Sequence, residues 1–198
     1  MRTSLPFLYD TVLLPFEFLA IRRWRRLLWS QAEGYKILEA GAGTGLNIPF
    51  YPPGREITLL DRDEAGLQKA RQRARKRGLQ VEFVQENVES LPFPDARFDT
   101  AVASFLLCSV QNPRQALSEL HRVLKPGGQL LLLEHVRSTG LTGYLLEVLS
   151  WPLYRLFEEH IARDTENHVR QAGFRQLFVQ PLCGDVVKLI RAEKARQA

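Results

Sequence analysis

Residues 35–45 read YKILEAGAGTG, an apolar run that ends in glycines at every second position. The first five residues predict a buried strand, and the glycines predict a tight turn whose backbone a ligand can approach closely. Ligands of open α/β sheets bind at the carboxyl ends of the strands, where this turn falls. A strand-to-helix turn without any ligand also needs glycine, so Gly41, Gly43 and Gly45 alone leave both interpretations open.

Strand and helix patterns alternate along the rest of the chain. Further strands are expected at residues 56–61, 81–85, 98–104 and 129–136, and helices at residues 63–77 and 113–124. Such alternation is typical of a parallel sheet covered on both faces. Two final strand-like runs, at residues 174–180 and 186–191, are too close together for a helical crossover, so we expect them to pair antiparallel.

The composition suits one globular domain. The chain has 198 residues, of which 45% are hydrophobic and 25% charged, and its formal net charge is +5. Its two cysteines, Cys108 and Cys183, have neither metal-site nor disulfide-framework spacing. The sequence shows neither the pattern of a signal peptide nor an apolar run long enough to span a membrane, so a cytoplasmic location is expected.

Two carboxylates flank the glycine turn in sequence. Asp61, which ends the second predicted strand, can accept two hydrogen bonds from a ribose diol, and both NAD and S-adenosylmethionine contain one. Leu46 occupies the position of the third glycine in the dinucleotide pattern G-x-G-x-x-G. Glu39 would repel a pyrophosphate but suits the cationic methionine end of S-adenosylmethionine. Glu39 could equally be a structural carboxylate that accepts hydrogen bonds from the loop amides.

Several segments resemble, in the right order, motifs of the class I S-adenosylmethionine-dependent methyltransferases, in particular the type 11 or ubiquinone/menaquinone-biosynthesis-like group. These segments are residues 37–45, 60–63, 87–93, 98–99 and 121–128. The resemblance covers about residues 35 to 135. It implies an α/β, Rossmann-like three-layer sandwich with a seven-stranded, mostly parallel sheet and an antiparallel last strand.

The resemblance also implies roles for individual residues. Glu39, Gly41 and Gly43 would hold the methionine end of S-adenosylmethionine, Asp61 its ribose and Arg62 its adenine. The family often has aspartate at the position of Asn87, whose carbonyl can still accept from the adenine amino group. The expected cofactor-binding residues are Glu39, Gly41, Ala42, Gly43, Asp61, Arg62, Asn87, Val88 and Ser104.

Methyl transfer from a sulfonium is an in-line displacement, so the enzyme mainly aligns and desolvates the acceptor. His135, at the end of the fifth predicted strand, could serve as a base near neutral pH, although a structural histidine is the commoner case. Tyr9 resembles the tyrosine of N-terminal lids in this group and is the second catalytic candidate. No metal site is expected: the acidic residues and His160 at positions 158–164 suit a solvated helix face better.

The acceptor is expected to be small and lipophilic: a thiol, a phenol or quinol, or an aminolipid. Residues 106–110, 134–136 and 151–152 resemble stretches of membrane-associated thiol methyltransferases and, more loosely, of bacterial phospholipid N-methyltransferases. Residues 141–157 are rich in apolar side chains, which are usually core but could line an acceptor site. A phospholipid N-methyltransferase at the membrane surface, a non-catalytic S-adenosylmethionine-binding protein and a nicotinamide-dependent oxidoreductase remain as alternatives.

The single domain is expected to divide into four parts. These are an N-terminal helical lid (1–34), a cofactor-binding core (35–136), an acceptor-side helical insertion (137–172) and a C-terminal hairpin (173–198). Within the first part, the run of arginines at residues 22–26, interleaved with tryptophan, could contact an anionic membrane surface. No nucleic-acid partner is expected, because residues 105–108 lack the Asn-Pro-Pro-Tyr type of motif.

Overall fold

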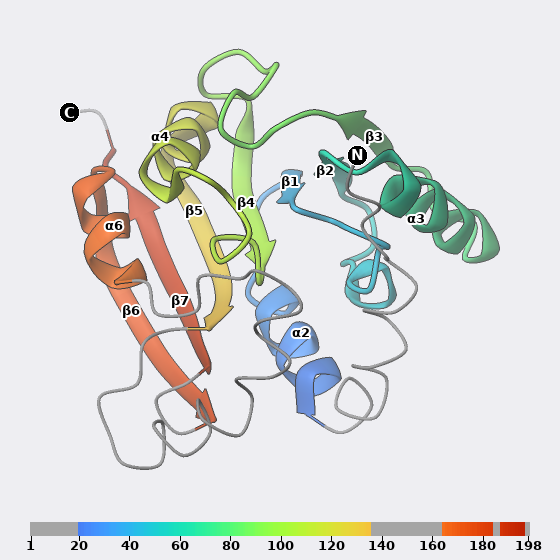
Figure 1. The fold of residues 1–198 in the computed structure, drawn as a ribbon, viewed down its shortest axis with the longest axis horizontal. Coiled ribbons are helices and arrows are strands. Elements are labelled where there is room, and N and C mark those ends of the chain that lie inside the picture. Colours follow the sequence, from blue (N-terminus) through green and yellow to red (C-terminus); the bar gives the residue numbers. More distant parts are fainter. Residues whose placement is uncertain (1–19, 136–163, 184–186, 197–198) are drawn as a thin grey trace.

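The computed structural model describes residues 20–135, 164–183 and 187–196 (Figure 1). They form a seven-stranded sheet in the order β3-β2-β1-β4-β5-β7-β6. The strands are β1 (Lys36–Ala40), β2 (Glu56–Asp61), β3 (Glu82–Gln85), β4 (Phe98–Ser104), β5 (Leu124–His135), β6 (Phe174–Cys183) and β7 (Val187–Lys194). The helices are α2 (Arg22–Trp29), α3 (Glu64–Lys76), α4 (Pro113–Val123) and α6 (Thr165–Gln171), with a 3-10 turn η2 (Ile48–Phe50).

Strands β1 to β5 are parallel to their neighbours, whereas β7 runs antiparallel between β5 and β6. The predicted mostly parallel sheet with an antiparallel last strand is therefore confirmed. Ala40 at the end of β1 lies beside Leu60 of β2 and Ala103 of β4. Because these strands are parallel, the residues that follow them meet at one edge of the sheet.

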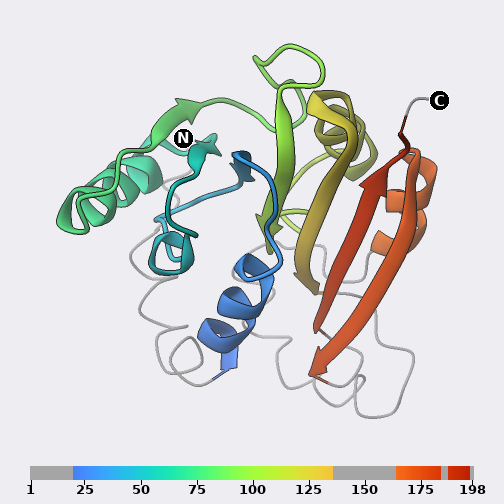
Figure 2. The ribbon, with the colours of Figure 1, turned by 180° about the vertical axis from the view of Figure 1, so that it is seen from behind.

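Helices cover both faces of the sheet, as Figures 1 and 2 show from opposite sides. On one face, Leu38 of β1 belongs to the same buried cluster as Leu117 of α4 and Val169 of α6. On the other face, Ile37 belongs to a cluster with Leu28 of α2 and buried alanines of α3. Adjacent strand residues point to opposite faces, so the alternation along β1 supplies both cores. The three-layer sandwich is confirmed.

Two strands differ in length from the sequence prediction. β5 begins at Leu124, five residues earlier than expected, because Leu124 pairs with Phe98 before an irregularity in the register. β6 continues through Pro181 to Cys183. Pro181 is tolerated because β6 is an edge strand, and an edge strand has one side on which no backbone donor is needed.

Helix α3 begins as its sequence predicts. The side chain of Asp63 accepts hydrogen bonds from the backbone N–H groups of Ala65 and Gly66, which have no partner within the helix. Over the described part of the chain, no helix has the length and apolar character needed to cross a membrane.

Candidate functional site

The glycine turn follows β1 directly and has a left-handed backbone at all three glycines, with φ values of 71° at Gly41, 52° at Gly43 and 82° at Gly45. A Cβ added at Gly41 would lie 2.6 Å from Leu106, and one at Gly45 would lie 2.5 Å from Ile48. At Gly43 an added Cβ would meet nothing within 4 Å. The outer glycines are thus needed for packing, whereas the backbone at Gly43 is open to a ligand.

Asp61 holds this open glycine in place from the end of β2. Its Oδ2 accepts a hydrogen bond from the Gly43 N–H at 2.7 Å, and its Oδ1 accepts one from the Asp63 N–H at 2.9 Å. Burial raises the pKa of the Asp61 carboxyl above its ordinary value, and these two hydrogen bonds oppose the rise. A carboxylate has about four lone-pair sites, so two accepted bonds leave capacity for a diol.

Glu39, only 1% exposed, is held by two side chains from the segment around η2. The amide of Asn47 donates to Oε1 of Glu39 at 2.6 Å, and the Tyr51 hydroxyl donates to Oε2. The partners of this carboxylate are therefore side chains and not the loop amides that the structural alternative anticipated. Burial raises the pKa of Glu39 to about 7, against the lowering effects of Tyr51, Asn47 and the nearby Arg25.

Strands β4 and β5 contribute a second group of residues at the same edge. Phe105, directly after β4, has φ of +54°, which is strained for an aromatic residue. The backbone N–H groups of Leu106 and Leu107 donate to Oε1 of the buried Glu134 at 2.9 and 3.0 Å. Glu134 thereby fixes the path of the chain after β4.

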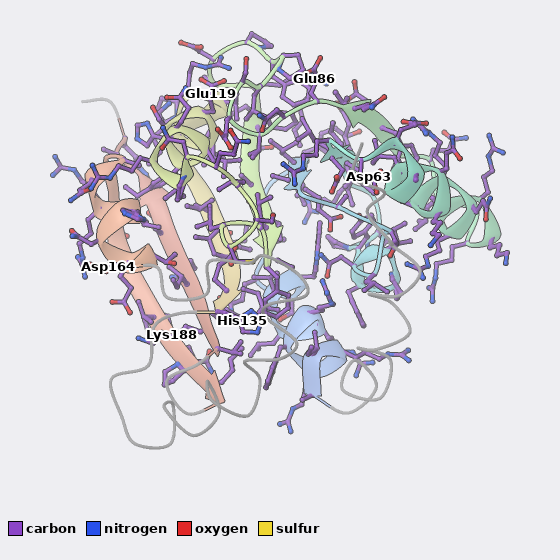
Figure 3. All side chains as sticks on the ribbon, viewed as in Figure 1. Asp63, Glu86, Glu119, His135, Asp164 and Lys188 are labelled. Carbon is purple, nitrogen blue, oxygen red and sulfur yellow. The ribbon has the colours of Figure 1, made fainter. Side chains whose placement is uncertain are left out.

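His135 ends β5 next to α2 (Figure 3). Its ring lies 4.6 Å from the ring of Phe105, centroid to centroid. Partial burial lowers the pKa of His135 to about 4, so the imidazole is neutral at pH 7. This value differs from the near-neutral pKa expected of a general base at this position.

The remaining predicted cofactor residues lie around this edge. Ser104 ends β4, is buried, and accepts a hydrogen bond from the Asn47 amide at 3.1 Å. Arg62 is exposed directly after β2, and Asn87 is exposed beyond β3 with its Oδ1 accepting from the Glu89 N–H. Val88 and Ala42 are buried.

Some predictions fall outside the described residues: Tyr9, residues 141–157, the acidic residues 158 and 159, and His160. Asp164 is described, and its side chain caps α6 by accepting from the Asn167 N–H. Within residues 20–135, 164–183 and 187–196, no group of three or more metal-ligating side chains gathers in one place.

Sequence reasoning missed the residues that hold Glu39 and the glycine turn. Asn47 and Tyr51 have no motif of their own, and Arg25 was assigned to a surface run, yet it is 5% exposed and donates to Asn47. Arg73 of α3 donates to both the carbonyl and the hydroxyl of Thr44 in the turn at 2.7 Å. The available signal for that pair was the presence of two polar side chains shortly after the glycine turn, Asn47 eight residues and Tyr51 twelve residues after Glu39.

The residues at this edge fit an S-adenosylmethionine molecule. The open backbone at Gly43 allows close approach of a ligand, and the spare lone pairs of Asp61 suit a ribose diol. The buried Glu39 carboxylate adds negative charge near the turn when it is ionised, which favours a cationic methionine end.

Comparison with known proteins agrees with this arrangement. A family model described as "Methyltransferase domain" matches residues 38–132. The chain is 35% identical over 196 residues to thiol S-methyltransferase TMT1B of Rattus norvegicus, covering 90% of this chain and 78% of the relative. It is 32% identical over 222 residues to the ubiquinone/menaquinone biosynthesis C-methyltransferase UbiE of Yersinia enterocolitica, covering 94% of this chain and 86% of the relative.

A solved S-adenosylmethionine-dependent methyltransferase from Thermotoga maritima has the same fold, with a TM-score of 0.74 and 22% identity, covering 96% of this chain and 98% of that chain. Three observations indicate the same family: the sheet order, the open glycine turn between two carboxylates, and the 35% sequence identity to a methyltransferase. This protein belongs to the class I S-adenosylmethionine-dependent methyltransferases.

Proposed function

We propose that this methyltransferase acts on a small, lipophilic thiol. The observation that carries the proposal is the apolar setting of His135 at the end of β5: its ring lies 4.6 Å from the ring of Phe105, and burial lowers its pKa to about 4. A neutral imidazole with so low a pKa is a weak proton acceptor. An acceptor that ionises readily by itself therefore suits this site best.

A thiol meets this requirement. The thiol of an unperturbed cysteine side chain has a pKa of about 8.5, so a few per cent is thiolate at neutral pH, whereas the phenol of tyrosine has a pKa of about 10. The thiolate is the nucleophile. The bound S-adenosylmethionine supplies the activated methyl group. Transfer of this methyl group to the thiolate would leave S-adenosylhomocysteine and a thioether as products, with the thiol proton lost to solvent.

The chain's own residues are proposed to bind and orient the two reactants. In this proposal Gly43 and Asp61 hold the cofactor, and Phe105 and Leu106 exclude water beside the acceptor sulfur. The similarity to rat thiol S-methyltransferase TMT1B over 90% of this chain supports the choice of sulfur. The similarity to a UbiE C-methyltransferase is the reason to test a quinol alongside it.

A product screen with labelled S-adenosylmethionine tests the acceptor. Thiophenol, phenol, a ubiquinol analogue and phosphatidylethanolamine are supplied in parallel, and labelled product and S-adenosylhomocysteine are both measured. We expect the thioether from thiophenol, with a rate that rises as pH approaches the pKa of the thiol. Product from the quinol or the aminolipid alone would overturn the thiol proposal. If no acceptor gives S-adenosylhomocysteine, the result would favour a non-catalytic S-adenosylmethionine-binding protein.

We also propose that the outer face of α2 contacts an anionic membrane surface. Arg22, Arg23 and Arg26 are exposed on this face, whereas Arg25 points inward. Arg23 and Arg26 line an open groove together with Trp24, Leu27 and Ser30 of the same segment and with Gln180, Pro181 and Leu182 of β6. These lining residues include no acidic side chain, so basic and apolar groups act together.

A further inference from the structure

Helix α2 contacts the segment around η2 through two side chains one turn apart. Arg25 donates from Nη1 to Oδ1 of Asn47 at 3.0 Å, and the Trp29 ring lies 4.4 Å from the Tyr51 ring. Asn47 and Tyr51 are the two residues that donate to Glu39, one to each carboxylate oxygen. The buried face of α2 therefore contacts both of the side chains that donate to the Glu39 carboxylate.

Arg25 also reaches the acceptor side of the sheet edge. The centre of its guanidinium lies 5.6 Å from the centroid of the Phe105 ring, which has His135 as a second ring neighbour at 4.6 Å. Asn47 adds a hydrogen bond to the hydroxyl of Ser104, the residue before Phe105. One buried guanidinium thus contacts both Asn47, which binds Glu39, and the strained Phe105.

We propose that Arg25 is a positioning residue for methyl transfer: it fixes Asn47, and through it Glu39, relative to Phe105, so that the cofactor and acceptor sides keep one geometry. This inference rests on methyl transfer at this edge of the sheet and not on the identity of the acceptor. Under this proposal α2, which precedes the methyltransferase motifs in sequence, contributes to the geometry of the site.

The chemistry of the position favours arginine for this task. A buried charge is costly unless it is partnered, so a cation that is 5% exposed is not an ordinary residue of a solvated helix face. The planar guanidinium can donate in its plane to Asn47 while its face lies against an aromatic ring. A lysine ammonium has no such face. Misplacement of reacting groups by about 1 Å can cost about 100-fold in rate.

The test compares Arg25→Gln and Arg25→Lys with the parent and with a matched control, Arg97→Gln. Like Arg25, Arg97 combines a side-chain hydrogen bond, here to Glu82, with a guanidinium that lies over aromatic rings, those of Phe93 and Phe98, but it lies at the amino end of β4. Binding of S-adenosylmethionine is measured by calorimetry between about pH 6 and pH 8, and kcat and KM are measured with thiophenol. Thermal unfolding is followed for every variant.

Both Arg25 variants should lower kcat at least tenfold at saturating substrates, whereas Arg97→Gln should leave it within about twofold. The pH profile separates positioning from simple stabilisation. The charge of Arg25 lowers the pKa of Glu39, so Arg25→Gln should move the midpoint of S-adenosylmethionine binding to higher pH, and Arg25→Lys should largely keep it. A loss of packing alone would not produce that difference between the two variants.

Parent-like kcat in Arg25→Lys would overturn the proposal, and so would an unchanged binding midpoint in Arg25→Gln. If Arg25→Gln does not fold, the kcat of Arg25→Lys, which keeps the buried charge, decides the question. If the parent gives no product with thiophenol, the thiol proposal fails by itself, and the binding midpoints still decide the role of Arg25.

Discussion

Gly43 and Gly54 adopt similar backbone conformations in different surroundings. Their φ values are 52° and 69°, and a Cβ added to either would meet nothing within 4 Å. Gly54 lies in the exposed connection before β2, whereas Gly43 donates its N–H to Asp61 in the glycine turn. Substitutions at the two positions therefore distinguish a loss of unfolding free energy, caused by the left-handed backbone, from a loss of ligand affinity, caused by obstruction.

Alanine at each of these positions should give a different result. Both Gly43→Ala and Gly54→Ala should lose about 1–2 kcal/mol of unfolding free energy, because a left-handed conformation strains any residue with a Cβ. Only Gly43→Ala should weaken S-adenosylmethionine binding, by more than tenfold in calorimetry, since its methyl group would occupy the open space. Equal affinities for S-adenosylmethionine in the two variants would contradict binding of the cofactor at Gly43.

At the level of elements, regular patterns were readable from sequence and long-range side-chain partners were not. Apolar runs predicted the sheet and the antiparallel β7, and the sequence also placed Asp63 at the beginning of α3, where it is the residue before Glu64. The pairing of Leu124 with Phe98 and the edge position of Pro181 depend on neighbouring strands, so local patterns could not reveal them. The sequence around Arg25 predicts a surface residue, because its partner Asn47 is 22 residues away.

For the candidate site, the glycine turn and Asp61 were predictable because motif spacing places them at strand ends. The surroundings of Glu39 and His135 were not, since the pKa of each depends on what packs around it. Burial raises the pKa of Glu39 to about 7 and lowers the pKa of His135 to about 4. Sequence position alone had suggested an ionised carboxylate and a histidine that titrates near neutral pH.

The outer face of α2 allows a test of membrane contact. Each arginine near an anionic surface contributes about 1 kcal/mol. Replacing Arg22, Arg23 and Arg26 together with glutamine should therefore reduce binding to phosphatidylglycerol-containing vesicles about 100-fold in sedimentation. The matched control removes three exposed charges from the end of α3 and the residue after it: Arg75, Lys76 and Arg77. Equal losses in the two triple variants would indicate non-specific attraction and contradict the assignment to α2.

For the molecule as a whole, Glu39 and His135 act on stability in opposite directions as pH changes. The Glu39 pKa is raised from 4.5 to about 7 in the folded chain, so folding binds a proton in that range and stability is lost as pH rises through it. The His135 pKa is lowered from 6.5 to about 4, so unfolding binds a proton in that range and stability is lost as pH falls through it. Between about pH 4.5 and 6.5 the two contributions largely cancel.

Single variants should expose each contribution. Relative to the parent, His135→Gln should show unfolding free energy that falls as pH rises from about 4.5 to 6.5, by about 1.4 kcal/mol per pH unit. Glu39→Gln should show the opposite slope over the same range, and the double variant should again follow the parent. Urea unfolding of the cofactor-free protein measures these slopes. Parallel pH profiles for the parent and both single variants would mean that neither group titrates abnormally, which would remove the low His135 pKa that supports a readily ionised acceptor.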